Sequence, residues 1–457
     1  MNYDEFLKNK AISIPCDGFS FNKADMNPAL FEWQKDIVAW ALKKGKAALF
    51  EDCGLGKTIQ QLEWCRIISQ YTGRPTLILA PLAVSQQTKR EGFKFGYDVN
   101  ICRSQRDIKA GINITNYDII DHFHFGILGG VVLDESSILK QYGGKTRTEI
   151  INRCRNIHYK LSCTATPAPN DYMELGNQAE FIGVMNRVEM LAEFFVHDNG
   201  KTTQWRLKGH AEKYFWEWLS SWAVVLTKPS DLGYESQGYI LPEINIKYIK
   251  VKSNGVIAST LSERREARRT SLESRCRVAK RVVDTAPNEQ WLIWCDLNDE
   301  ADKLKRIIPG AREVRGTDDT ERKELRLAAF SEGLIKKLIT KPSIAGFGLN
   351  WQLCHNMIFV GLSDSYELLY QAIRRCWRFG QRRKVNVYII TSTTEGAVRD
   401  NIERKDAQCK TMIAEMISHT KEILANDIKA TVHMTEDYRP MVLMETPDWL
   451  IEGGYAV

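Results

Sequence analysis

The sequence predicts two α/β domains in tandem, each built on a parallel β-sheet flanked by helices. Two groups of short apolar runs, four in each group, alternate with segments of helical pattern. Several of these runs are continuously apolar, which is typical of strands buried on both faces of a parallel sheet. About 125 residues without such alternation separate the two groups. The chain of 457 residues is long enough for two or three domains of ordinary size.

The expected strands follow the alternation rule for α/β folds. The first group covers 47–50, 76–80, 130–134 and 160–164, and the second covers 291–295, 336–340, 357–361 and 385–390. Helical patterns lie between most of them, for example at 57–69 and 321–333.

The region between the two groups contains a helical pattern of its own. Phe215, Trp218, Leu219 and Trp222 are spaced as one face of a helix, which we expect to pack on the core of the first domain. Further on, 261–281 carries pairs of arginines one turn apart. A solvated helix face is the simpler interpretation of these arginines, and contact with phosphates is the alternative.

Composition restricts the class of protein. With 44% apolar and 26% charged residues, the chain is typical of a soluble globular protein. It has no run of eighteen apolar residues, and its N-terminus lacks the apolar stretch of a secretory signal, so we expect no membrane span and no secretion. Eleven cysteines without a C-x-x-C pair argue against a zinc site and favour a reducing, cytoplasmic compartment. A net charge of +6 permits an anionic partner, such as nucleic acid, without requiring one.

The segment 51–58, EDCGLGKT, ends like a phosphate-binding loop. An expected strand precedes it and an expected helix follows, which is the context that such a loop requires. Gly54 and Gly56 would allow close approach of the backbone to phosphate, and the helix start favours an anion. Lys57 would contact the β- and γ-phosphates, and the Thr58 hydroxyl would hold Mg²⁺.

A second candidate feature is the run VVLDESS at 131–137, in which a buried strand ends in two carboxylates. Ligands of open α/β sheets bind at the carboxyl ends of the strands. Asp134 is therefore a candidate for holding Mg²⁺, and Glu135 for activating the attacking water as a general base. An acidic helix cap after a strand is the alternative interpretation.

A third feature is the basic segment QAIRRCWRFGQRRK at 371–384. Arg375 and Arg378 are three residues apart and share a helical face. Two fixed guanidinium groups could stabilise charge on a transferring γ-phosphate, if both domains share one nucleotide. A surface or nucleic-acid-binding basic helix is the alternative, and Arg382, Arg383 and Lys384 agree with it.

In this order, the three features resemble motifs I, II and VI of the superfamily-two helicases and translocases, most closely the Swi/Snf-type DNA-dependent ATPases. The general phosphate-loop pattern is G-x-x-x-x-G-K-[ST], and this chain has Glu51 in place of the first glycine. The loop of the Swi/Snf-type group reads D-E-x-G-L-G-K-T, so Glu51 and Asp52 match its acidic pair, and the absence of that glycine is a family trait. Motif VI reads Q-x-x-x-R-x-x-R-x-G-Q, which this chain matches at Gln371, Arg375, Arg378, Gly380 and Gln381.

The resemblance extends over about residues 25 to 400 and implies further roles. Upstream of the loop, 31–42 resembles the glutamine motif, which makes Gln34 the expected reader of adenine through its amide. Segments 77–92, 113–120 and 291–296 resemble motifs Ia, Ib and IV, the first two of which face nucleic acid in the family. The implied ATP contacts are Gln34, Gly54, Leu55, Gly56, Lys57 and Thr58. The implied coupling residues are Thr164 and Thr166 in motif III and Gly346, Gly348 and Asn350 in motif V.

Some positions depart from the family pattern. Ser136 and Ser137 replace the last two residues of Asp-Glu-Ala-His in motif II, which puts in doubt the usual histidine link to motif III. Ala345 and Ser343 stand where motif V usually has glycine and often has arginine, and Trp377 replaces a histidine of motif VI. None of these changes removes a Mg²⁺ ligand, the phosphate lysine or an arginine finger, so the resemblance implies an active ATPase.

The fold that the resemblance implies is two tandem RecA-like domains with ATP and nucleic-acid sites in the cleft between them. We expect a first domain at 1–245, with a helical connecting region from about 175, a second domain at 246–410, and a C-terminal helix and tail at 411–457. Within the tail, the apolar Trp449, Leu450 and Ile451 favour a strap across the core over a docking segment.

The implied function is an ATP- and Mg²⁺-dependent motor that acts as a monomer on double-stranded DNA through backbone contacts. No protein partner can be identified, although a role as the catalytic part of a larger machine stays open. Three alternatives also stay open: a strand-separating DNA or RNA helicase, a nucleic-acid binder that has lost turnover, and an unrelated phosphate-loop kinase or GTPase.

Overall fold

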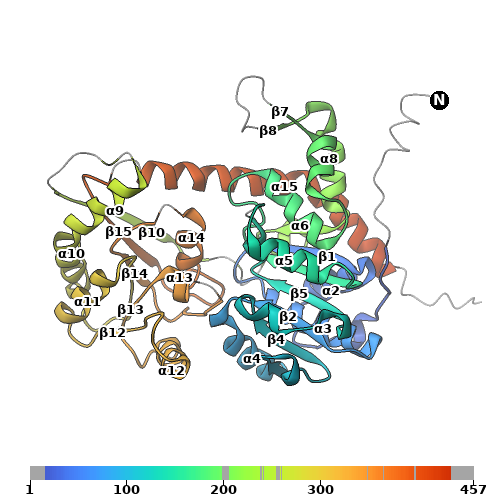
Figure 1. Cartoon of the computed structure of the whole chain (residues 1–457), viewed down its shortest axis with the longest axis horizontal. Coiled ribbons are helices and arrows are strands. Elements are labelled where there is room, and N and C mark those ends of the chain that lie inside the picture. Colours follow the sequence, from blue (N-terminus) through green and yellow to red (C-terminus); the bar gives the residue numbers. More distant parts are fainter. Residues whose placement is uncertain are drawn as a thin grey trace, which may run out of the picture.

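The computed structural model describes residues 16–140, 142–197, 205–236, 239, 241–253, 258, 260–346, 348–363, 365–395 and 398–433. The expected strap with Trp449, Leu450 and Ile451 lies outside these residues. The described chain forms two α/β lobes side by side, each with its own parallel sheet, and one long helix runs along both (Figure 1).

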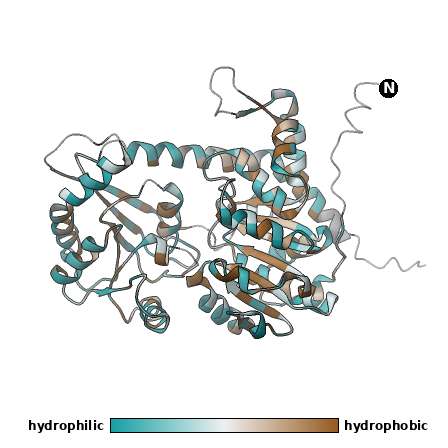
Figure 2. Ribbon diagram, in the orientation of Figure 1, coloured by the Kyte–Doolittle hydropathy of each residue, from teal (hydrophilic) through white to brown (hydrophobic). Residues whose placement is uncertain are grey.

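The first lobe is built on seven parallel strands in the order β3-β4-β2-β5-β6-β1-β9. Their bounds are β1 Lys46–Glu51, β2 Thr76–Ala80, β3 Val99–Ile101, β4 Ile112–Asn116, β5 Gly130–Asp134, β6 Tyr159–Thr164 and β9 Ala223–Leu226. Along β1, Ala47 and Leu49 pack on one face of the sheet, and Ala48 and Phe50 pack on the other. Both faces are therefore buried, as the continuous apolar strands predict. Figure 2 shows strands of this sheet in the colour of hydrophobic residues.

Helices cover both faces of this first sheet. One face is covered by α2 Glu32–Lys44 and α3 Lys57–Thr72, with α4 Ser85–Lys94 beside α3 and β3. The other is covered by α5 Lys145–Cys154, α6 Leu175–Ile182, α7 Arg187–Phe194 and α8 Glu212–Ser220. A two-stranded hairpin, β7 Phe195–His197 with β8 Trp205–Leu207, projects from this lobe beside α8 (Figure 1).

The second lobe is built on six parallel strands in the order β10-β15-β14-β11-β13-β12. Their bounds are β10 Ile244–Val251, β11 Trp291–Trp294, β12 Arg312–Glu313, β13 Lys337–Thr340, β14 Asn356–Phe359 and β15 Val385–Ser392. One face packs against α10 Leu272–Asp284 and α11 Asn298–Ile307. The other packs against α12 Thr320–Ser331, α13 Pro342–Ala345 and α14 Tyr366–Ile373, and α9 Leu261–Thr270 leads into α10.

The last described element is α15, a continuous helix from Val398 to His433. Near its start, Val398 and Ile402 are buried in the core of the second lobe. Further along, Met416 and Leu424 are buried in the two cores of the first lobe. The helix therefore joins the lobes a second time, in addition to the chain segment that runs from β9 to β10.

The α/β fold with two parallel sheets is confirmed, and all eight expected strands occur with ends within two residues of expectation. The helix face at Phe215, Trp218 and Leu219 is also confirmed, because these side chains of α8 are buried in the first lobe. Trp222 is buried in the same core, but it lies two residues beyond the end of α8. The region between the two expected groups of strands, which shows no clear strand alternation in the sequence, contains β7, β8, β9 and β10. β9 is a short apolar run at one edge of the first sheet, and β10 is an edge strand of mixed polarity in the second sheet.

Of the arginine pairs at 261–281, Arg268 is buried and paired with Asp296, whereas Arg269 is exposed. Among the described helices, none combines the length and apolarity needed to cross a membrane. All eleven cysteines are unpaired, and ten of them are buried.

Candidate active site in the inter-lobe cleft

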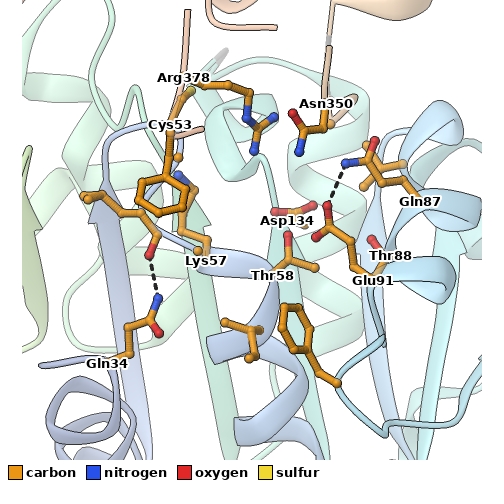
Figure 3. A pocket seen from close by; sticks show the side chains of 18 of the residues that line it. Gln34, Cys53, Lys57, Thr58, Gln87, Thr88, Glu91, Asp134, Asn350 and Arg378 are labelled. Carbon is orange, nitrogen blue, oxygen red and sulfur yellow. Dashed lines mark hydrogen bonds between the residues drawn. The ribbon is translucent and has the colours of Figure 1, made fainter. Parts of the chain in front are cut away.

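A cavity of about 430 Å³ lies between the two lobes. The first lobe contributes the loop 53–59 and side chains of α4, and the second lobe contributes residues 348–352 and 375–379. Figure 3 shows Lys57, Thr58 and Asp134 on one side of this cavity, and Asn350 and Arg378 facing them from the other lobe. The loop, the acidic pair and the arginines that motif spacing singled out therefore meet at one place.

The loop 51–58 turns between β1 and the first residue of α3, where backbone N–H groups and the helix dipole favour an anion. The Lys57 ammonium donates to the carbonyl oxygens of Glu51 at 2.6 Å and Asp52 at 3.2 Å, so the loop is folded around its own lysine. Gly56 caps α3 in a left-handed conformation. Thr58 and Leu55 line the same cavity.

Glu51 is the last residue of β1 rather than a loop residue, and its side chain is fully buried. It accepts a hydrogen bond from the Gln60 amide at 2.8 Å. Burial raises the pKa of the Glu51 carboxyl to about 7, although the nearby Lys57 opposes this shift. The acidic residue that replaces the first glycine of the general pattern therefore links the end of β1 to Gln60 of α3 and does not line the cavity.

Asp134 ends β5, and Glu135 follows it in a left-handed conformation with φ of 56°, the one positive φ of a described residue other than glycine. Such a conformation costs about 1–3 kcal/mol and persists where the surrounding structure enforces it. Here the Tyr117 hydroxyl donates to the Asp134 carbonyl at 2.8 Å, and the Gln61 amide donates to the Asp134 carboxylate at 2.8 Å. The turn therefore holds both carboxyl groups at the cavity.

The environment of the acidic pair suits a general base. Glu135 is 7% exposed, and its Oε2 atom has no hydrogen-bond partner among the described residues. Burial and the neighbouring Asp134 raise the pKa of Glu135 to about 7, and burial also raises that of Asp134. A carboxylate with a pKa near neutrality is suited to accepting a proton from water.

Arg375 and Arg378 reach the cavity from the second lobe. Both donate to the carbonyl oxygen of Leu349, at 3.2 Å and 3.0 Å, and Arg375 also donates to the Gln371 amide oxygen at 2.9 Å. No carboxylate among the described residues forms an ion pair with either guanidinium. Burial and the charge of Arg375 lower the pKa of Arg378 to about 10. Two buried cations sharing one neutral acceptor form a site with excess positive charge, which an anion in the cavity would compensate.

The residues present fit a Mg²⁺ ion bound together with phosphates. The described residues contain no cluster of three or more His, Cys, Asp or Glu side chains that could hold a metal without other ligands. Mg²⁺ is usually held by one or two carboxylates together with substrate phosphates and water. The Asp134 carboxylate and the Thr58 hydroxyl line the cavity together, and the unpartnered Glu135 oxygen lies beside them.

Gln34 lies at the cavity, but its amide also bonds to the protein. It is 2% exposed, accepts from the backbone N–H of Phe31 at 3.0 Å and donates to the Leu55 carbonyl at 2.8 Å. One N–H and one lone pair of the amide are left for a base, so adenine recognition stays a prediction. Sequence reasoning missed the aromatic side chains beside it: the Tyr239 ring is 5.0 Å from Phe379 and 6.0 Å from Phe31, between ring centroids.

Two glycines allow the lobes to approach each other closely. A Cβ atom at Gly54 would lie 3.0 Å from the backbone nitrogen of Phe379, and one at Gly348 would lie 2.2 Å from a Val84 methyl group. Both have positive φ angles, 95° and 72°. Gly54 was predicted to allow approach of phosphate, but the group that comes closest to it is the backbone of the second lobe.

The expected coupling residues also lie at the lobe interface or near it. The backbone N–H of Thr166 donates to the Thr164 hydroxyl at 3.1 Å, and the Thr166 hydroxyl reaches Glu367 of the second lobe at 3.5 Å. Asn350 lines the cavity with a buried, unpartnered Oδ1, and Gly346 caps α13. Glu367 also accepts from Lys140, so a single carboxylate of α14 contacts two segments of the first lobe.

The positions that depart from the family pattern have structural replacements. The Gln178 amide donates to the Ser136 carbonyl at 3.0 Å and accepts from the Ser162 hydroxyl at 2.6 Å. Gln178 of α6 therefore connects motif II with β6, the strand that leads into motif III, in place of the histidine link. Trp377 donates through its indole N–H to the Pro242 carbonyl at 2.7 Å, which joins the end of motif VI to the segment between the lobes.

The segment expected to be motif Ia contributes to the cavity as well. Gln87, Thr88 and Glu91 of α4 line it, together with Val84 just before the helix (Figure 3). The Gln87 amide donates to the Glu91 carboxylate at 2.9 Å. Nucleic-acid contact by motifs Ia and Ib stays a prediction.

Residues 274–380 match the family described as the helicase conserved C-terminal domain. The chain contains a helicase C-terminal domain. This domain carries β11, β13 and β14 of the second sheet, and it extends through motif VI to Gly380. Together with the two parallel-sheet lobes, it confirms the resemblance to superfamily-two helicases that the motifs indicated.

Comparison with curated proteins finds partial relatives of this chain. Protein p41 of Acyrthosiphon pisum secondary endosymbiont phage 1 is 28% identical over 179 residues, which cover 33% of this chain and 38% of that protein. TATA-binding protein-associated factor 172 of Homo sapiens is 25% identical over 210 residues, which cover 38% of this chain and 11% of that protein. The chain therefore spans less than two fifths of either relative.

Two solved structures extend the comparison to most of the chain. The DUF1998 helicase MrfA bound to DNA matches with a TM-score of 0.56 and 14% identity, over 83% of this chain and 51% of that one. The SWI2/SNF2 ATPase core of Sulfolobus solfataricus in complex with dsDNA matches with a TM-score of 0.41 and 15% identity, over 91% and 98%. At these identities the similarity to MrfA shows a shared fold.

Proposed function

We propose that the protein hydrolyses ATP to ADP and phosphate and uses this cycle to move along double-stranded DNA. The observation that carries the proposal is that Arg375 and Arg378, which form no ion pair with a carboxylate of the described residues, face Lys57 and the acidic pair across one cavity. A cavity with cations from both lobes and two carboxyl groups from one lobe is suited to a nucleoside triphosphate with its metal ion.

In the proposed reaction each side chain has one role. Lys57, released from the carbonyl oxygens that it now contacts, binds the β- and γ-phosphates. Thr58 and Asp134 would hold Mg²⁺, which supplies positive charge to the phosphates when it is bound. Glu135 accepts the proton of the attacking water, the bond between the β,γ-bridging oxygen and the γ-phosphorus breaks, and ADP leaves. Arg375 and Arg378 stabilise the charge on the γ-phosphoryl group in transfer.

The base of ATP would lie against Phe31, Tyr239 and Phe379, which line the cavity near Gln34. Because Phe379 belongs to the second lobe, a nucleotide bound there contacts both lobes through its base as well as its phosphates. A ligand that binds the closed arrangement more tightly than the open one shifts the protein towards closure, and hydrolysis reverses that shift.

DNA as the track is supported by the motif resemblance and by the shared fold with MrfA, whose solved structure is bound to DNA. Binding through the phosphate backbone would depend little on sequence and would weaken as salt concentration rises. The test is the ATPase rate with single-stranded DNA, duplex DNA, forks and RNA over a salt series, with Lys57→Ala as the inactive control. An equal rate with and without nucleic acid would contradict the motor function, and a Lys57→Ala variant with full turnover would contradict the ATP site.

Strand separation is a second candidate function, and the hairpin of β7 and β8 favours it. Motif spacing showed no such hairpin, yet Figure 1 shows it projecting from the first lobe. A forked-duplex unwinding assay beside a triplex-displacement assay distinguishes the two activities. A translocase displaces the third strand without opening the fork, whereas a helicase opens the fork.

A further inference from the structure

Asp52 of the first lobe is bound by two side chains of the second lobe. The Arg374 guanidinium donates to one Asp52 carboxylate oxygen at 2.7 Å, and the Tyr370 hydroxyl donates to the other. Arg374 also donates to the carbonyl oxygen of Cys53, the next residue of the phosphate loop. The contact is buried, because Arg374 is 3% exposed. It joins residues more than three hundred positions apart in the sequence.

Arg374 is placed differently from the two arginines that follow it. Arg375 and Arg378 line the cavity, whereas Arg374 does not and lies 5.1 Å from the centre of the Trp377 ring. Burial works to lower the pKa of Arg374, but the Asp52 carboxylate and Tyr370 offset this and leave the pKa raised. Arg374 is therefore a charged residue whose partner is the protein itself rather than a ligand in the cavity.

The face of α14 that meets the first lobe carries a second polar contact. Glu367, Tyr370 and Arg374 are three and four residues apart, so they lie on one side of the helix. Glu367 binds Lys140 and reaches Thr166, while Arg374 binds Asp52. The second lobe thus contributes the negative Glu367 at the start of this face and the positive Arg374 at its end. The first lobe contributes the opposite charges, Lys140 and Asp52. Such an arrangement favours a single register of α14 against the first lobe.

We propose that Asp52, Tyr370 and Arg374 form a latch that sets the position of motif VI against the phosphate loop and so places Arg375 and Arg378 at the transferring phosphate. The three are positioning residues, since none of them lines the cavity. The proposal rests on the proposed ATPase function. It also distinguishes the two acids of the loop: Glu51 is buried at the end of β1 and bonded to Gln60, whereas Asp52 binds the other lobe.

Because Arg374 and Arg375 are adjacent, loss of the latch is expected to displace Arg375 and so to lower the rate of ATP hydrolysis. A shift of about 1 Å in a catalytic group can lower a rate about 100-fold. ATP would still bind through Lys57 and the rest of the first lobe. Loss of the latch is therefore expected to lower kcat about 100-fold while the KM for ATP changes less than about threefold.

The test compares Asp52→Asn, Arg374→Met and the double variant in steady-state ATPase assays with nucleic acid. If Asp52 and Arg374 act as one pair, their effects on kcat are not additive, and the kcat of the double variant falls no further than that of the more impaired single variant. The matched control is Arg399→Met, which breaks the exposed pair with Glu403 at the start of α15 and keeps kcat within about twofold. Tyr370→Phe keeps the ring, removes one hydrogen bond and is expected to lower kcat about tenfold.

A second readout does not depend on hydrolysis. Dyes on Cys16, the exposed native cysteine, and on a cysteine at the exposed Glu321 of α12 report the distance between the lobes by energy transfer. Without nucleotide, the native protein is expected to give one narrow distribution, and Arg374→Met a broader one at lower transfer efficiency. A kcat of Arg374→Met within threefold of native, or an unchanged transfer distribution in a folded variant, overturns the latch. Absence of ATPase activity in the native protein would instead overturn the proposed function, and the distance measurement would still test the latch.

Discussion

Gly348 of motif V provides a direct test of whether activity depends on close approach of the two lobes. In a Gly348→Ala variant the new Cβ would lie 2.2 Å from a Val84 methyl group of the first lobe. Carbon atoms in contact are normally at least about 3.5 Å apart, so the lobes would have to separate locally by about 1.3 Å or the side chains would have to move. The backbone adds a separate cost, because φ at Gly348 is 72° and this region costs a residue with a side chain about 1–2 kcal/mol.

The two costs predict different observables. The backbone cost lowers the free energy of unfolding by about 1–2 kcal/mol, which thermal denaturation measures. The separation displaces motif V and the neighbouring arginines from the phosphate loop by about 1 Å, and we expect kcat to fall about 100-fold. Gly310→Ala is the matched control, since Gly310 lies in the same lobe with φ of 74° and has no atom within 4 Å of the position of a Cβ. It should lose similar stability and keep its kcat.

A compensating variant sharpens the test. Adding Val84→Ala to Gly348→Ala removes the methyl groups at 2.2 Å and 3.1 Å and leaves the Val84 Cβ at 3.0 Å. The clash becomes smaller without disappearing. We therefore expect the kcat of the double variant to be at least about tenfold higher than that of Gly348→Ala, which itself loses about 100-fold. Full activity of Gly348→Ala, or an equal loss of kcat in Gly310→Ala, would refute the reasoning.

The remaining predictions concern the cavity itself. Lys57→Ala should abolish binding of a fluorescent ATP analogue, because the loop loses its phosphate cation; retained affinity would count against the site. Glu135→Gln should bind ATP with near-native affinity and lower kcat by about 10²- to 10⁴-fold, as measured by phosphate release. Phe379→Ala should raise the KM for ATP and leave DNA affinity unchanged, measured by titration of each ligand. Removal of Mg²⁺ by a chelator should stop hydrolysis, and added Mg²⁺ should restore it; turnover in excess chelator would contradict the metal site.

The central strands could be predicted from the sequence because their burial on two faces leaves a local pattern. Edge strands leave a weaker pattern: β12 has two residues, and β10 mixes polar and apolar residues without a regular alternation. The cavity residues of the loop, the acidic pair and motif VI could be predicted for a similar reason. Each group is contiguous in the chain, and its chemistry depends on local backbone geometry at the end of a strand or within a helix.

The contacts that assemble these groups could not be predicted in the same way. Asp52 and Arg374 are 322 residues apart, and nothing near either position indicates which charge it meets. The replacement of the histidine link by Gln178 likewise depends on how α6 packs beside β6. Gln34 was expected to read adenine, and only the folded chain reveals that its amide also binds Leu55. These features depend on tertiary placement rather than on motif spacing.

The helix α15 behaves mechanically as a rod. Its 36 residues correspond to a length of about 54 Å, so tilting it by one degree moves its far end by about 1 Å. Ile402 anchors one end in the second lobe, and Leu424 and Ile428 anchor the other in the first. A motion of one lobe relative to the other, whether a tilt or a twist about the helix axis, would therefore either bend α15 between its two anchors or pull buried side chains out of a core. We expect α15 to bend between its anchors when the cleft opens, which dye pairs placed along α15 would report as a shortened distance while pairs across the cavity change.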